Sequence, residues 1–94
     1  MRLTATELNV LREELHAADP AGRAYLFGSR IDDARRGGDI DVYFEATCPI
    51  DLKTALALQY RLISRCGEKV DLLIKNPGQP EQPIHTIARQ GIPL

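Results

Sequence analysis

The 94-residue sequence lacks several features that identify common classes of protein. Its two cysteines, Cys48 and Cys66, are not at a metal-binding spacing and have no secretory context, so we predict free thiols in a reducing cytoplasm. The N-terminus has no long apolar run, and we expect neither a signal peptide nor a transmembrane span. No Walker-type lysine follows a glycine-rich loop, which excludes a P-loop NTPase.

An excess of charge of one sign is also absent. Lys and Arg number 12, Asp and Glu number 13, and the net charge is −1, so no overall field attracts nucleic acid or a membrane surface. The composition, 44% hydrophobic and 27% charged, is that of a globular domain. We predict a single domain over residues 1–94, with a core small enough to favour a homo- or hetero-oligomer and no separate acceptor-binding domain.

The apolar pattern predicts alternating helices and strands. Thr4 and Glu7 fit a capping box for a helix ending near Ala18, and Gly67 is placed to end the longest helix. The predicted elements are helices over 4–18, 29–36, 52–66 and from Pro83, with strands over 23–27, 39–45 and 69–74. This α-β-α-β-α-β-α order predicts an α/β (α+β) fold class, in which helices cover one face of a small sheet.

Periodicity also predicts which residues point inward. Tyr25 and Tyr43 are interpreted as strand packing, and His16 and His85, without partners at metal spacing, as surface or structural residues. The inward residues of the last two helices are predicted to be Leu52, Ala55, Leu56, Leu62, Ile63 and Cys66, then Ile84, Ile87 and Ala88.

The stretch over residues 26–41 indicates chemistry. A strand ends at Gly28-Ser29, and glycine lets the backbone approach an anion closely. Ser29 can cap a helix whose free N–H groups bind phosphate. Arg30 adds positive charge, with Arg35 and Arg36 as further candidates.

Asp39 and Asp41 frame Ile40 in the strand that follows. On a strand such residues share a face about 6.6 Å apart, and two carboxylates there can bind one or two Mg²⁺ or Mn²⁺ ions. Glu45 continues this series and is interpreted as solvated.

Asp71 interrupts the apolar strand VDLLI and is predicted to face away from the core. A charge there is costly to bury unless it is paired or bound to metal. If it shares a side with Asp39 and Asp41, three carboxylates converge. Asp71 could then be the general base or a ligand of the catalytic metal.

The pattern of Gly28-Ser29, nine intervening residues and Asp39-Ile40-Asp41 resembles the signature of the DNA polymerase β-like nucleotidyltransferases. The fuller string from Gly28 to Val42 resembles their smallest branch, the minimal nucleotidyltransferases (MNT). The segments 69–74 and 87–94 are similar to that family's third-carboxylate strand and closing helix. Gly38 departs from the pattern, since many relatives have serine there.

The resemblance implies a small mixed sheet with helices behind it and an active site on its open side. It also implies Mg²⁺-dependent transfer of AMP from ATP, with Asp39, Asp41 and Asp71 as metal-binding and catalytic residues. Gly28, Ser29 and Arg30 would bind the phosphates. MNT proteins are often paired with HEPN-domain toxins, so the implied acceptor is a toxin tyrosine and the implied role is that of an antitoxin.

Three alternatives stay open on the sequence. A non-catalytic antitoxin would neutralise its partner by binding alone. A small-molecule nucleotidyltransferase would need an acceptor site that this chain is too short to carry in a second domain. A nucleic-acid polymerase is disfavoured because the balanced charge offers no strand-binding groove.

Overall fold

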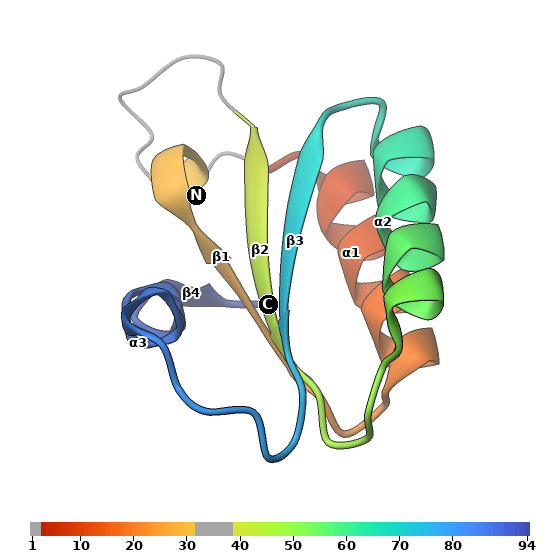
Figure 1. Cartoon of the computed structure of the whole chain (residues 1–94). Coiled ribbons are helices and arrows are strands. Elements are labelled where there is room, and N and C mark those ends of the chain that lie inside the picture. The colour runs from red at the N-terminus through yellow and green to blue at the C-terminus, as the bar shows by residue number, and fades with distance from the viewer. Residues whose placement is uncertain (1–2, 32–38) are drawn as a thin grey trace.

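Helices pack on both faces of one four-stranded sheet in the computed structural model, which describes residues 3–31 and 39–94 (Figure 1). The sheet order is β3 (Val70–Lys75), β2 (Ile40–Glu45), β1 (Arg23–Phe27) and β4 (Ile92–Pro93). β2 is parallel to β3, whereas β1 is antiparallel to both β2 and β4. The mixed sheet confirms the predicted fold class.

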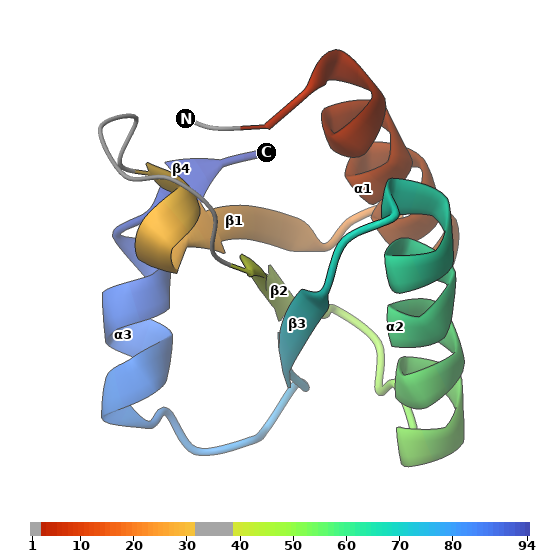
Figure 2. The same cartoon turned by 90° about the horizontal axis from the view of Figure 1, so that it is seen from above.

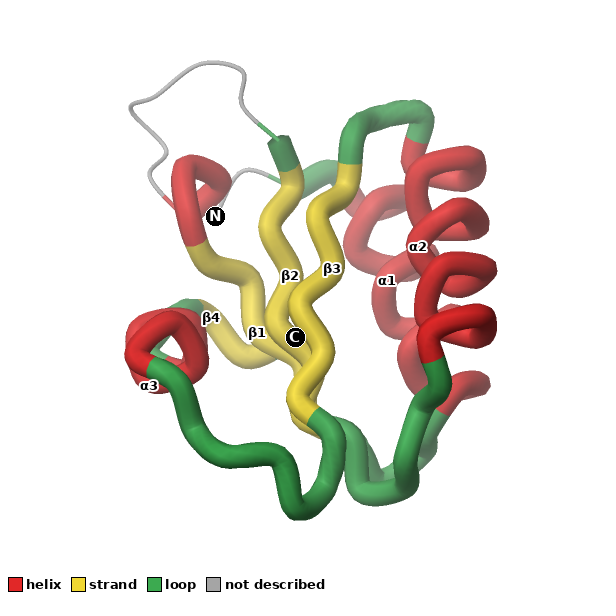
Figure 3. The backbone as a smooth tube through the Cα atoms, viewed as in Figure 1, coloured by secondary structure: helices red, strands yellow, loops and turns green. Residues whose placement is uncertain are grey.

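Two long helices form a layer on one face of the sheet. These are α1 (Ala5–Ala18) and α2 (Leu52–Cys66), which lie together in Figure 2, while α3 (Pro83–Arg89) lies on the other face. The loop after β3 carries the chain across to α3 (Figure 3). The expectation that helices cover only one face is therefore wrong for α3.

The hydrophobic core fills the space between the sheet and the α1/α2 layer. Side chains alternate across a strand, so every second residue of β2 points to that layer. The fully or almost fully buried residues of this core include Leu11, Leu26, Ile40, Val42, Phe44, Leu58, Leu62 and Val70.

Local capping signals explain why the long helices begin and end where predicted. Thr4 N donates to Glu7 Oε1 at 2.8 Å and Glu7 N donates to Thr4 Oγ1 at 3.0 Å, which closes the capping box of α1. Gly67 ends α2 in the left-handed conformation at φ 68°. These caps depend only on residues that are close in the sequence, so the sequence pattern predicts them directly.

The C-terminal segment differs from the prediction of three strands and a closing helix. α3 ends at Arg89, and residues 92–93 form β4 against β1, with Leu94 N donating to Ala24 O at 2.9 Å. Gly91 permits this pairing because a Cβ there would collide with Leu26 O. A two-residue strand has too few residues to show period-2 alternation.

The predicted inward faces of α2 and α3 are partly wrong. Leu52, Leu56 and Ile63 are exposed, whereas Leu62 is buried as predicted, together with Leu58, which was not among the predicted inward residues. In α3, Ile84 and Ile87 are exposed whereas His85 and Ala88 are buried. α2 carries apolar side chains on two sides, and in α3 a histidine lies on the buried side, so periodicity alone does not decide which side of each helix meets the sheet.

Other predictions have simpler outcomes. The short helix predicted over 29–36 is seen as the 3₁₀ helix η1 (Gly28–Ile31), and its remainder lies outside the described residues. Cys48 and Cys66 are free thiols, as predicted. Over residues 3–31 and 39–94, no helix has the length and apolarity to cross a bilayer.

Candidate active site

The turn at Gly28 lies directly against the side chain of Asp41. Gly28 follows β1 with φ +74°, a conformation that favours glycine. A Cβ at this position would collide with the Asp41 carboxylate. The structure thus brings the predicted phosphate turn and Asp41 together, and glycine is needed both for its φ and for the space.

Asp41 and Asp71 face each other across neighbouring strands. They are register partners in the parallel pairing of β2 with β3. Burial raises the pKa of Asp41, and the charges of Asp71 and Asp39 and a side-chain hydrogen bond with Asp71 raise it further. Asp71 therefore lies on the same side of the sheet as Asp41, away from α1 and α2, which meets the condition that the sequence left open for Asp71.

Asp39 lies just before β2 and is held differently. Its Oδ2 is 3.4 Å from Lys69 Nζ, and its side chain is 45% exposed. Within the described part of the chain, no three His, Cys, Asp or Glu side chains are grouped closely enough to hold a metal ion together. The chain alone brings Asp41 and Asp71 together, with Asp39 near enough to affect Asp41.

The donor set suits a hard divalent cation. Burial, and after it the neighbouring carboxylates, disfavour the charge of Asp41, and a positive charge between Asp41 and Asp71 would offset that cost. Oxygen ligands are those that Mg²⁺ and Mn²⁺ prefer. Asp41 and Asp71 would supply such oxygens, and Asp39 would complete the set on release from Lys69.

Arg30 lies in η1 and contacts carboxylates that the sequence analysis did not connect with it. Its guanidinium nitrogens are 3.6 Å from Glu7 Oε1 and 3.7 Å from Glu68 Oε2, and the residue is buried. The arginine thereby ties η1 to α1 and to the turn before β3. Its role in phosphate binding stays a prediction, as do those of Arg35 and Arg36, which lie outside the described residues, and of Ser29.

The sequence did not indicate a second polar group, which lies between α3 and β2 on the sheet face that carries Asp41. Arg89 of α3 donates to both carboxylate oxygens of Glu45, at 3.2 and 2.9 Å, and to Tyr43 Oη at 3.3 Å. It also pairs with Glu81. The interpretation of Glu45 as solvated is wrong, because Arg89 holds it and keeps its pKa below the usual value.

Aromatic rings stack next to the Arg89–Glu45 pair, between α3 and the sheet. His85 stacks on Tyr43 with centroids 5.6 Å apart, and Tyr43 stacks on Tyr25 at 5.9 Å. His85 tolerates burial because its Nδ1 accepts a hydrogen bond from Gln82 N at 2.9 Å. The structural interpretation of His85 and the packing role of Tyr25 and Tyr43 agree with this arrangement, which fixes α3 beside the carboxylates.

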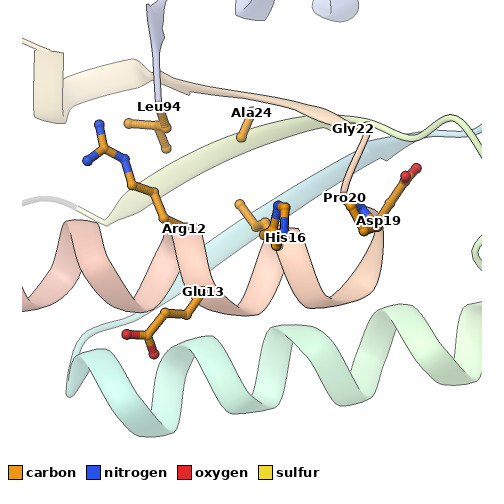
Figure 4. A pocket seen from close by; sticks show the side chains of 9 residues that line it. Arg12, Glu13, His16, Asp19, Pro20, Gly22, Ala24 and Leu94 are labelled. Atoms are coloured by element: carbon orange, nitrogen blue, oxygen red, sulfur yellow. The ribbon is translucent and has the colours of Figure 1, made fainter.

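Two hollows lie at different distances from the carboxylates. The larger, about 440 Å³, lies between α1 and the sheet, where Arg12 reaches toward Leu94 and His16 lies below Ala24 (Figure 4), and Asp41 does not line it. The smaller, about 340 Å³, borders Gly28 and is lined by Phe27, Gly28, Ile87, Gln90 and Gly91. We regard the smaller one as relevant, because it adjoins the glycine that touches Asp41.

Comparisons with known proteins agree with the fold described above. A family model described as "Polymerase beta, Nucleotidyltransferase" matches residues 9–94. No curated protein matches the chain. One similar solved chain, 28% identical with a TM-score of 0.59, belongs to a rebuilt and re-refined structure of the tri-AMPylated Shewanella oneidensis HEPN toxin in complex with MNT antitoxin. The match covers 72% of this chain and 52% of that one, so this chain spans about half the length of its solved relative.

Proposed function

Because this chain belongs to the polymerase beta nucleotidyltransferase family, we propose that it transfers AMP from ATP to a hydroxyl group, with Mg²⁺ as cofactor. The observation that carries the proposal is the in-register pair Asp41 and Asp71 beside the Gly28 turn. A carboxylate pair that could hold a divalent cation, next to a glycine turn that lets the backbone approach a phosphate, suits phosphoryl-group chemistry.

The acceptor in this proposal is a tyrosine of a HEPN toxin, which the added AMP neutralises. Support comes from the similar solved complex, in which a HEPN toxin is tri-AMPylated and bound to MNT antitoxin. In this proposal the acceptor hydroxyl is supplied by another protein molecule, the toxin. The chain would then act as an antitoxin.

Each residue has a defined part in the proposed reaction. The Gly28 turn and Ser29 would bind the β- and γ-phosphates. Asp39, Asp41 and Asp71 would hold Mg²⁺, which would supply charge stabilisation at the reacting phosphate. The alternative role of Asp71 is that of the general base, which would accept the proton of the attacking hydroxyl. The hydroxyl oxygen bonds to the α-phosphorus as the bond to the β-phosphate oxygen breaks, and pyrophosphate leaves.

The hollow beside Gly28 would hold the organic part of the nucleotide. Phe27 and Ile87 offer apolar surface there, and Gln90 offers an amide. Ile87→Ala is expected to raise KM for ATP by about 3–10-fold with little change in kcat, since part of the ground-state contact is lost. Ile84→Ala, one turn away on α3 and outside that lining, is the matched control. Equal KM values for the two variants would contradict this position for the nucleotide.

The decisive experiment follows the mass of each protein. The purified chain is incubated with ATP, Mg²⁺ and the product of the neighbouring gene, and intact masses are measured over time. We expect one or more AMP masses on the partner. Asp41→Asn should slow the transfer at least about 10²-fold.

A matched substitution controls for charge and folding. Asp51→Asn also removes one carboxylate, but at the N-cap of α2, where asparagine caps about as well as aspartate. It should transfer AMP at the wild-type rate. Wild-type transfer by Asp39→Asn or Asp41→Asn would refute the proposed site.

The pairing of Asp39 with Lys69 favours one second candidate, a non-catalytic antitoxin. A stable complex that forms without any mass change, and that survives EDTA and Asp41→Asn, would support that function instead.

A further inference from the structure

An apolar stripe runs along α2 on a side that the chain itself leaves uncovered. Leu52, Leu56, Tyr60 and Ile63 are 75%, 57%, 71% and 37% exposed. Steps of four, four and three residues place them on one side of the helix. We call these four residues the α2 stripe.

The neighbours of the α2 stripe locate it on the molecule. Gln59, beside the stripe, donates to Val70 O of β3 at 3.0 Å. On the opposite side of the helix, Arg61 and Arg65 pair with Glu14 and Glu13 of α1. The stripe therefore faces away from α1, next to the outer strand β3.

This surface is separate from the candidate active site. Asp41 and Asp71 lie on the sheet face that carries α3, whereas α2 packs on the other face (Figure 2). A protein that brings an acceptor hydroxyl to these carboxylates has no need to touch the α2 stripe. The stripe is thus available to an occupant other than the substrate.

The spacing of the stripe matches a second copy of itself. Its pattern is nearly symmetric about a point level with Leu58, so a two-fold axis there would place Leu56 against the partner's Tyr60, and Leu52 against the partner's Ile63. Such an interface is isologous, which is the commonest arrangement in soluble oligomers.

Charge does not oppose the antiparallel arrangement. Lys53 flanks the stripe at the N-terminal end, and the two-fold axis puts the two copies of Lys53 at opposite ends, roughly 14 Å apart along the helix axis. That separation exceeds the screening length of about 8 Å at physiological salt. In an antiparallel pair, the positive N-terminal end of each helix macrodipole also lies beside the negative C-terminal end of the other, which is favourable.

The area is sufficient for weak but specific association. The four side chains expose on the order of 400–500 Å², as large as the largest apolar patch of a typical monomer. Two stripes would bury roughly 900 Å² before the flanking residues are counted, close to the lower limit of about 1,000–1,200 Å² for specific interfaces.

We propose that two copies of this chain associate through their α2 stripes about a two-fold axis, with the helices antiparallel and both carboxylate sites left open. The proposal does not depend on the chemistry of the carboxylates.

Light scattering coupled to size-exclusion chromatography tests the proposal over a range of protein concentrations. The wild-type chain should approach twice the mass of one chain. Leu56→Glu should reduce that mass about two-fold at the same concentration, with an unchanged far-UV circular dichroism spectrum. Ile84→Glu is the matched control, because it places the same charge on an exposed isoleucine of α3, on the other face of the sheet.

Three outcomes would overturn the proposal. One is a wild-type chain that stays monomeric at every concentration. Another is a dimer that persists in both Leu56→Glu and Tyr60→Glu. The third is a monomer whose complex with the neighbouring gene product is lost in Leu56→Glu, which would give the stripe to that partner instead.

Discussion

At the scale of single residues, the negative charge of Asp41 is unfavourable in the folded protein. Asp41 and Asp71 face each other in register, and burial together with the neighbouring carboxylates raises the pKa of Asp41. A raised carboxyl pKa means that the folded chain binds the proton more tightly than the unfolded chain. The Asp41 charge therefore lowers stability at neutral pH.

Asp41→Asn should consequently stabilise the free protein at pH 7. We expect an increase in Tm of about 1–4 °C, kept small because the site is partly open to solvent. Added Mg²⁺ should raise the Tm of the wild type and leave that of the variant nearly unchanged. Differential scanning calorimetry with and without EDTA measures both effects, and a variant less stable than wild type would contradict the explanation.

Arg30 is expected to show the opposite behaviour. It is buried between Glu7 and Glu68, so Arg30→Gln leaves the Glu7 carboxylate, itself only 6% exposed, without that cation. The substitution should cost about 1–3 kcal/mol of unfolding free energy, measured by urea unfolding. If Arg30 also binds phosphate, KM for ATP rises as well, and an unchanged KM would restrict it to a structural role.

At the scale of elements, sequence reasoning succeeded where a signal is local. The capping pair Thr4 and Glu7, the N-cap Asp51 and the left-handed Gly67 determine helix ends through bonds to residues three or four positions away. It failed where the answer depends on distant residues. Whether Leu56 or Leu58 of α2 is buried depends on where the sheet lies.

The same distinction between local and distant signals applies to the site. The alternation in residues 39–42 predicted that Asp39 and Asp41 share a face, and the single charged residue in the apolar run VDLLI predicted the orientation of Asp71. Nothing near Arg89 in the sequence indicated its bonds to Glu45 and Tyr43, because those partners are more than 40 positions away. Such pairings need the topology first.

The junction between α3 and β4 gives a prediction at this scale. A Cβ at Gly91 would collide with Leu26 O, so Gly91→Ala must displace β4 or the end of β1. We expect a loss of about 1–3 kcal/mol in unfolding free energy, typical of overpacking. Gln90→Ala, at an exposed neighbouring position, should cost less than about 0.5 kcal/mol.

At the scale of the whole molecule, carboxylates held in the folded state should determine acid stability. Hydrogen bonds from Thr47, Cys48 and Ala21 lower the pKa of Asp19, and Arg89 lowers that of Glu81 to about 2. A lowered pKa adds stability above the unfolded value and loses it as pH falls through the folded value. We therefore expect stability to fall between about pH 4 and pH 2.

Two variants separate the causes of this acid loss. Asp19→Asn should flatten the profile of unfolding free energy below about pH 4 at any salt concentration, because its partners are neutral groups. The contribution of Glu81 depends on the charge of Arg89 and should shrink in high salt. Urea unfolding at a fixed protein concentration measures both, and an acid arm unchanged in Asp19→Asn would show that other groups control it.

The absence of tryptophan gives the stacked tyrosines a practical use. With no tryptophan to absorb or emit in the near ultraviolet, the optical signals of this protein come mainly from Tyr25, Tyr43 and Tyr60. The buried Tyr43 stacks on His85 of α3 and on the half-buried Tyr25, whereas Tyr60 is 71% exposed on the α2 stripe. Near-ultraviolet circular dichroism should therefore follow the docking of α3, while quenching of tyrosine emission by a small solute should follow the covering of α2. The chain thus carries two unlabelled reporters, one for each face of its sheet.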